Sequence, residues 1–136
     1  MGVNQLAGTL SRAYEHRYLG LVPDVVDGTV TLSMDFEPRD SQTLAENINF
    51  WVLNEDGLRR VASGARPEDV NIATGGRIQF GPSRGTLRAV FTPSGRGQYT
   101  VIVYNNSDVP AKFLLTAEEA LLEDESGSTT VPGSLP

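Results

Sequence analysis

Few residues in this chain have side chains suited to catalysis. There is one histidine, His16, and there is no cysteine, so thiolate metal sites, cysteine nucleophiles and disulfides are excluded. A hydrolytic triad would need an activated serine beside His16. A zinc site would need a carboxylate as every other ligand, which is unusual. We therefore predict no catalytic residue, and we interpret His16 as a strand histidine held by local hydrogen bonds.

Carboxylates in two turns are better suited to calcium, a hard cation that prefers oxygen ligands. Asp24 and Asp27 share the first turn, and Asp40 follows the next strand. Their spacing does not fit an EF-hand loop, and acidic turns are usually just solvated. We therefore expect no metal and no other cofactor, with Asp24, Asp27 and Asp40 as the calcium candidates.

A further group of residues has the composition of a binding surface. Residues 47–57 hold the only tryptophan, and residues 50–53 are apolar on both faces of an extended chain. If Phe50, Val101 and Phe113 face the core, their neighbours face outward. That predicts an apolar outer patch, larger than scattered exposed residues explain, made of Trp51, Leu53, Ile102, Tyr104 and Leu114. Its cover is expected to be the residue pair 121–122, the loop 63–85, or a partner.

These residues need strands to position them, and the sequence supplies strand patterns. Residues 29–36 alternate strictly, with Val30, Leu32, Met34 and Phe36 on one face. Similar patterns run over 9–22, where Tyr14, His16 and Tyr18 are the expected inward set, and over 48–53, 58–62, 86–92, 98–105 and 111–117. Gly and Pro turns separate them. The pattern predicts an all-β, antiparallel two-sheet sandwich of the jelly-roll or Ig-like kind.

The remaining segments divide the chain. Residues 1–8 are interpreted as a leader, residues 9–117 as the sandwich, and residues 118–136 as a short helix with a flexible tail or linker. The helix prediction rests on a capping box formed by Thr116 and Glu119. A single helical turn is also expected after Thr43, and a brief strand over 77–80.

Composition limits the partners. The chain has 136 residues and a net charge of −6, which argues against nucleic acid because phosphate binding needs a basic surface. No apolar run is long enough to span a membrane. The N-terminal residues have no signal-peptide pattern. The expected compartment is extracytoplasmic if the chain is part of an exported protein.

Three stretches carry a family resemblance. They are Gly28-Thr-Val-Thr-Leu32, the strand 49–53 with its Asp56-Gly57 turn, and Gly97-Gln-Tyr-Thr-Val-Ile-Val103. Their order resembles the bacterial pre-peptidase C-terminal domain, over about residues 9–117. This resemblance implies a non-catalytic sandwich attached to exported bacterial enzymes, with an accessory or binding role.

The sequence thus favours a non-enzymatic accessory or assembly module that acts through protein–protein contacts. One alternative is a carbohydrate-binding module with Trp51, Tyr104 or Tyr14 as stacking platforms. Another is a structural subunit of a homo-oligomer.

Overall fold

In the computed structural model of this chain, residues 4–11, 15–24, 28–78, 81, 85–93 and 97–123 are described. The first half contains β1 (Gln5–Leu10), β2 (His16–Pro23), β3 (Val30–Glu37), α1 (Gln42–Asn47), β4 (Ile48–Leu53), α2 (Glu55–Ala62) and α3 (Pro67–Val70). The second half contains β5 (Ala73–Thr74), β6 (Gly76–Arg77), β7 (Leu87–Phe91), β8 (Tyr99–Asn105), β9 (Ala111–Glu118) and β10 (Ala120–Glu123).

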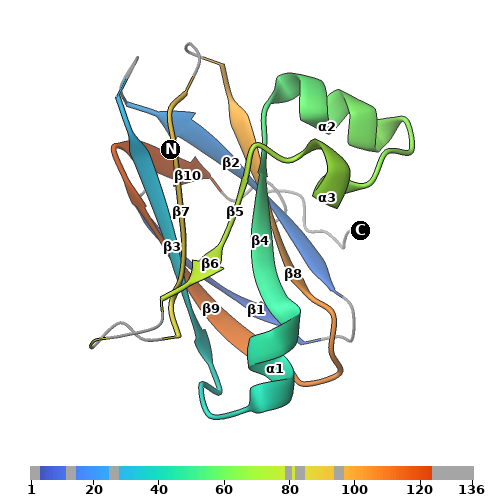
Figure 1. Ribbon diagram of the computed structural model, residues 1–136, viewed down its shortest axis with the longest axis vertical. Helices are drawn as coiled ribbons and strands as arrows, with labels where there is room; N and C mark the ends of the chain where they lie inside the picture. Colours follow the sequence, from blue (N-terminus) through green and yellow to red (C-terminus); the bar gives the residue numbers. More distant parts are fainter. Residues whose placement is uncertain are drawn as a thin grey trace.

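The strands form two five-stranded antiparallel sheets that pack face to face (Figure 1). The β3 sheet has the order β1-β9-β3-β7-β6, and the β8 sheet has the order β10-β2-β8-β4-β5. The chain is therefore the all-β two-sheet sandwich that the alternating patterns predict. The strand patterns at 29–36, 86–92, 98–105 and 111–117 correspond to β3, β7, β8 and β9.

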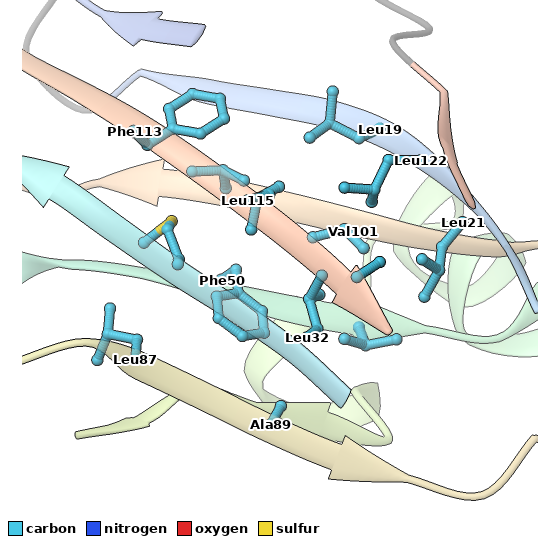
Figure 2. Packing of buried hydrophobic residues seen from close by; sticks show 14 of the residues in the cluster. Leu19, Leu21, Leu32, Phe50, Leu87, Ala89, Val101, Phe113, Leu115 and Leu122 are labelled. Carbon is cyan, nitrogen blue, oxygen red and sulfur yellow. The ribbon is translucent and has the colours of Figure 1, made fainter. Parts of the chain in front are cut away.

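The core lies between the sheets, where side chains from alternate strand positions meet (Figure 2). Leu32 of β3, Phe50 of β4, Val101 of β8 and Leu115 of β9 are all fully buried there. In β3 the burial alternates, because the outer side of that sheet faces water. In β8, the middle strand of its sheet, nearly every residue is buried, so both faces of this strand are covered.

The first strand region differs from its prediction. Residues 9–22 hold parts of two strands, β1 and β2, which lie in different sheets. The expected inward aromatic set is wrong, because Leu19 and Leu21 are the residues of β2 in the core while His16 and Tyr18 face outward. Two leucines fill the core better than a partly polar histidine and tyrosine. Tyr14 lies outside the described residues.

Two predicted elements have the wrong type in the structure: one predicted strand is a helix, and one predicted helix is a strand. Residues 58–62, predicted as a hairpin strand, belong to α2, whose first turn is capped by the Asn54 side chain accepting from the Gly57 N–H at 2.8 Å. The predicted C-terminal helix is wrong: β10 occupies Ala120–Glu123, because Ala120 and Leu122 complete the core. The short helix near Thr43 is present as α1, with Ser41 as its N-cap.

The sandwich extends beyond its predicted boundaries. β1 begins at Gln5, within the expected leader, and β10 ends at Glu123, within the expected tail. Residues 63–85, expected to be irregular, contain α3 and the two short strands β5 and β6. Gly75 joins β5 in one sheet to β6 in the other, so this segment links the two sheets along one side.

Candidate functional site

The outer face of the β8 sheet carries four of the five predicted patch residues. Trp51 of β4 is paired with Ile102 of β8, and Leu53 lies two residues further along β4. Tyr104 of β8 is paired with His16 of β2 on its other side. These residues share a face because alternate side chains of adjacent strands point the same way.

The fifth patch residue is elsewhere. Leu114 lies on β9, in the β3 sheet, opposite Asp35 of β3 and Ala7 of β1. The expectation that all three apolar stretches share one sheet is therefore wrong for residues 111–117. Leu114 is half-buried on the outer face of the second sheet, beside Asp35, and does not join the other four.

Two patch residues are covered by the chain itself. Leu53 and Ile102 are completely buried, yet neither belongs to the core between the sheets. The segment of α2 and α3 packs against β4 and β8 on this outer side (Figure 1). The pair 121–122 does not supply this cover, since both residues belong to β10, the edge strand of this same sheet, and Leu122 is part of the main core. Part of the patch thus serves internal packing.

The part of the β8 sheet's outer face that remains uncovered holds three aromatic rings. They belong to His16, Trp51 and Tyr104, and we call them the ring cluster. The Trp51 and Tyr104 rings are stacked, with centroids 4.0 Å apart and planes at 19°. The His16 ring lies 6.2 Å from Trp51 and 6.1 Å from Tyr104, at 25° and 27°. Trp51 and Tyr104 are half-buried and His16 is exposed. Beside them Tyr18 is 40% exposed.

A charged pair at the start of α3 lies near enough to the ring cluster to act on it. Burial raises the pKa of the Tyr104 phenol above its ordinary value, and the negative charge of Glu68 raises it further. Glu68 is in turn paired with Arg66, so a carboxylate and a guanidinium lie at the edge of the aromatic surface. The cluster therefore combines ring faces with hydrogen-bond donors and acceptors.

We expect Tyr104 to ionise at higher pH than a free tyrosine, whose pKa is about 10. The difference in ultraviolet absorbance between the intact chain and Tyr104→Phe, followed against pH, isolates this one phenol. Glu68→Gln should lower the pKa of Tyr104 but leave it raised, because burial is the larger cause. A Tyr104 that titrates at the free value would contradict this burial.

The raised pKa of Tyr104 also makes the free energy of unfolding depend on pH. A phenol whose pKa is raised on folding contributes stability that is fully present below pH of about 10 and is lost as pH rises through the folded pKa. The free energy of unfolding should therefore fall in that alkaline range, and less steeply in Tyr104→Phe.

The ring geometry limits what the cluster can bind. Rings that enclose a quaternary ammonium must surround it from several directions. These three planes lie within 27° of one another, and Trp51 and Tyr104 each cover one face of the other, so their remaining faces are the ones on which a flat group can stack. Tyrosine and tryptophan at a surface also present an apolar body with a polar tip, which suits protein contacts.

The predicted calcium candidates are not brought together. Asp24 follows β2 and Asp40 precedes α1. The end of β2 and the start of α1 lie at opposite ends of the sandwich (Figure 1), and Asp27 lies outside the described residues. Asp24 borders a shallow hollow with Asn4, Glu118 and Glu119. Within the described ranges, no three histidine or acidic side chains are arranged to hold a metal ion.

One segment of the chain has the spacing of a catalytic motif. Residues 81–85, Gly-Pro-Ser-Arg-Gly, match the Gly-x-Ser-x-Gly spacing of a nucleophile elbow. Such an elbow lies between a strand and a helix, whereas this segment connects β6 to β7. β7 is in the β3 sheet, while His16 is on the outer face of the β8 sheet. Ser83 itself lies outside the described residues, so the pattern carries no catalytic assignment.

The ring cluster was only partly foreseen. Trp51 and Tyr104 were predicted as surface aromatics, but His16 was not placed with them, because the pairing of β2 with β8 cannot be read from local sequence.

No helix within the described ranges is long and apolar enough to cross a membrane.

Comparison with known proteins supports the fold. No protein-family profile matches the chain, and no curated protein matches it either. Among solved structures, it is similar to the pre-peptidase C-terminal domain of a collagenase from Bacillus anthracis, with a TM-score of 0.57. The two share 14% identity over 87% of this chain and 91% of the other. The family resemblance is thus confirmed at the level of the fold, and at this identity it assigns no site.

Proposed function

We propose that this chain is a non-catalytic accessory module that binds a protein partner through the ring cluster. The observation that carries the proposal is the incomplete cover of the β8 sheet: Leu53 and Ile102 are buried on its outer face, where α2 and α3 pack, but His16, Trp51 and Tyr104 remain accessible. Tryptophan and tyrosine are the residues that most often dominate the binding energy of protein interfaces. The rim of Arg66 and Glu68 adds charged groups at the edge, as interfaces commonly have.

The compartment proposed for this function is extracytoplasmic. Its support is the fold, since the similar solved structure is a domain of a collagenase, and the resemblance implies attachment to exported enzymes. The lack of cysteine is compatible with export, because a core of this size needs no disulfide.

The test uses Trp51 as its own reporter. Trp51 is the only tryptophan, so its emission reports on the ring cluster alone. The structural neighbour belongs to a collagenase, so the first protein probe is a collagen triple-helical peptide, followed by denatured collagen and other extracellular matrix proteins. Saturable changes in emission, confirmed by calorimetry, are expected for one of these probes.

Substitution tests whether binding uses this face. Tyr104→Ala should weaken binding by about 30-fold or more, the loss typical of an aromatic at the centre of an interface. Leu114→Ala is the matched control, since it removes a half-buried apolar side chain from the outer face of the other sheet. Equal losses in both variants, or none in either, would reject the ring cluster as the binding site.

A carbohydrate-binding module is the second candidate, and the near-parallel rings favour it. A sugar ring can stack its C–H face on an aromatic face, while Arg66 and Glu68 offer a donor and an acceptor for hydroxyl groups. Neutral β-linked glucan and N-acetylglucosamine oligosaccharides are the corresponding probes. A response to these, without one to the protein probes, would select this candidate over the first.

A further inference from the structure

β1 is the longest open edge of the sandwich. Among the described residues, β1 pairs only with β9, and it runs for six residues at the edge of the β3 sheet. The other three edges are shorter: β5 and β6 have two residues each and β10 has four. An open edge presents unpaired N–H and C=O groups that suit another strand.

The hydrogen-bond pattern between β1 and β9 shows which backbone groups of β1 point away from the sheet. The Ala117 N–H donates to the Asn4 carbonyl at 2.8 Å, so Asn4 and Ala117 form a hydrogen-bonded pair. Because such pairs alternate along an antiparallel ladder, the backbones of Leu6, Gly8 and Leu10 bond to β9. The backbone N–H and C=O groups of the intervening residues, Gln5, Ala7 and Thr9, therefore point away from the sheet.

The β1 strand itself has none of the features that usually protect an open edge. Proteins block open edges with proline, with charged side chains or with bulges. The β1 sequence Gln-Leu-Ala-Gly-Thr-Leu contains no proline and no charge, and its pairing with β9 is continuous. The residues whose backbones face outward carry small or uncharged side chains. A second strand can therefore approach the backbone of β1 without meeting a proline or a charge that belongs to β1 itself.

We propose that β1 pairs antiparallel with β1 of a second copy of this chain, which joins two β3 sheets into one. An antiparallel self-pairing is closed by a twofold axis, so it gives a dimer and not a fibre. The outward groups must face one another for hydrogen bonding. The register centred on Ala7 meets this condition over the whole strand, with Ala7 on the axis and Gln5 opposite Thr9 of the second copy.

The same register gives complementary side chains on the inner face. Leu6 is only partly buried, packed against the edge of the core. In this register it lies opposite Gly8 of the second copy, where there is no side chain. The Phe113 ring and the Arg17 guanidinium lie at the inner side of Gly8, since a Cβ there would be 2.6 Å from the ring and 3.1 Å from Arg17 Nη1. The guanidinium lies over the Phe113 ring, 5.9 Å from its centroid. Leu6 of each copy would thus meet the Phe113 ring beside one cation, and no charged residues of β1 itself meet.

The association is expected to be weak, because a single strand pair lies at the small end of interface sizes. Light scattering and sedimentation should therefore be run on the full chain up to about 1 mM, the range of the weakest specific complexes. The expected result is a concentration-dependent rise from the 14.7 kDa monomer towards twice that mass. A chain that stays monomeric throughout overturns the proposal.

Two substitutions at the axis test the register. Ala7→Pro removes an N–H that points outward and bonds nothing in β9, so the fold should persist while the dimer is lost. Ala7→Lys places two like charges opposite each other and should have the same effect by a different cause. Unchanged dimerisation in both folded variants would show that another surface is responsible.

Cysteine cross-linking gives an independent test, since the chain has no cysteine of its own. In the proposed register the two Cα atoms of residue 7 are about 5.5 Å apart, within reach of a disulfide. The two Cα atoms of residue 9 are about 14 Å apart, from a displacement of four residues. Ala7→Cys should therefore form a covalent dimer on oxidation, and Thr9→Cys should not. Equal cross-linking of both would reject this register.

The ring cluster lies on the β8 sheet and β1 lies in the β3 sheet, so binding to the ring cluster is tested separately from dimerisation.

Discussion

Replacing Phe50 with alanine should lower the free energy of unfolding by about 3–5 kcal/mol, the usual cost of deleting a large aromatic side chain from a core. Phe50 is completely buried between the sheets (Figure 2), on the inner face of β4. Its removal leaves a cavity that the strands on either side cannot close without breaking their ladders. Urea denaturation followed by circular dichroism measures this loss.

Val90→Ala is the matched control for Phe50→Ala. Val90 lies on the outer face of β7 and is 56% exposed, so its substitution should change the free energy of unfolding by no more than about 0.5 kcal/mol. A Phe50→Ala variant as stable as this control would mean that Phe50 does not fill the core as described. A similar loss in both would point to a general effect of strand substitution.

The core could be predicted where burial follows a period of two. In β3, the alternation of Val30, Leu32, Met34 and Phe36 with polar residues determines which side faces the core, because the outer face of that sheet is wet. In β2 the same rule chose the wrong face. There Tyr18 and Leu19 are both apolar, and only the packing of the opposite sheet decides between them.

Local signals failed where long-range packing outweighed them. Thr116 and Glu119 have the spacing of a capping box, but a helix there would withdraw Leu122 from the core. The chain instead turns at Glu119, which has a φ of 66°, and returns as β10 along β2. Conversely, Asn54 to Gly57 looks like a hairpin turn, yet the Asn54 side chain caps α2. Asparagine and glycine favour both structures.

In the candidate site, too, local sequence predicted some features and long-range packing decided the others. Trp51 and Tyr104 could be assigned to a surface because their neighbours in sequence are core residues. Their contact with each other, and with His16, depends on β8 lying between β2 and β4. Leu114 was grouped with them wrongly for the same reason, since the assignment of β9 to the other sheet has no local signal.

Gly75 is the position where the addition of one methyl group should be most damaging. Gly75 joins the two sheets between β5 and β6. A Cβ there would lie 2.5 Å from Asn49 Oδ1, 2.9 Å from Phe50 Cε2 and 3.0 Å from Leu87 Cβ. These distances are too short for real contacts, and Leu87 and Phe50 are core residues that cannot move freely.

The Asn49 side chain makes this close approach part of the structure. Its Nδ2 donates to the Gly75 carbonyl at 3.0 Å, and its Oδ1 accepts from the Gly75 N–H at 3.1 Å. An asparagine thus pairs with the glycine backbone as a neighbouring strand would. Any shift that relieves the clash would stretch both hydrogen bonds, each of which contributes about 1 kcal/mol.

Gly75→Ala should therefore lower the free energy of unfolding by about 2–4 kcal/mol, through overpacking and the loss of these hydrogen bonds. Gly76→Ala is the control one residue away, where the nearest atom to a Cβ is the Arg88 carbonyl oxygen at an ordinary 3.7 Å. Asn49→Ala removes these two hydrogen bonds, and the one that Asn49 Oδ1 accepts from the Phe50 N–H at 2.7 Å, without crowding Gly75, so its loss gives an upper bound for the hydrogen-bond part. If Gly75→Ala is no less stable than Gly76→Ala, the two sheets are not joined by a tight contact at Gly75.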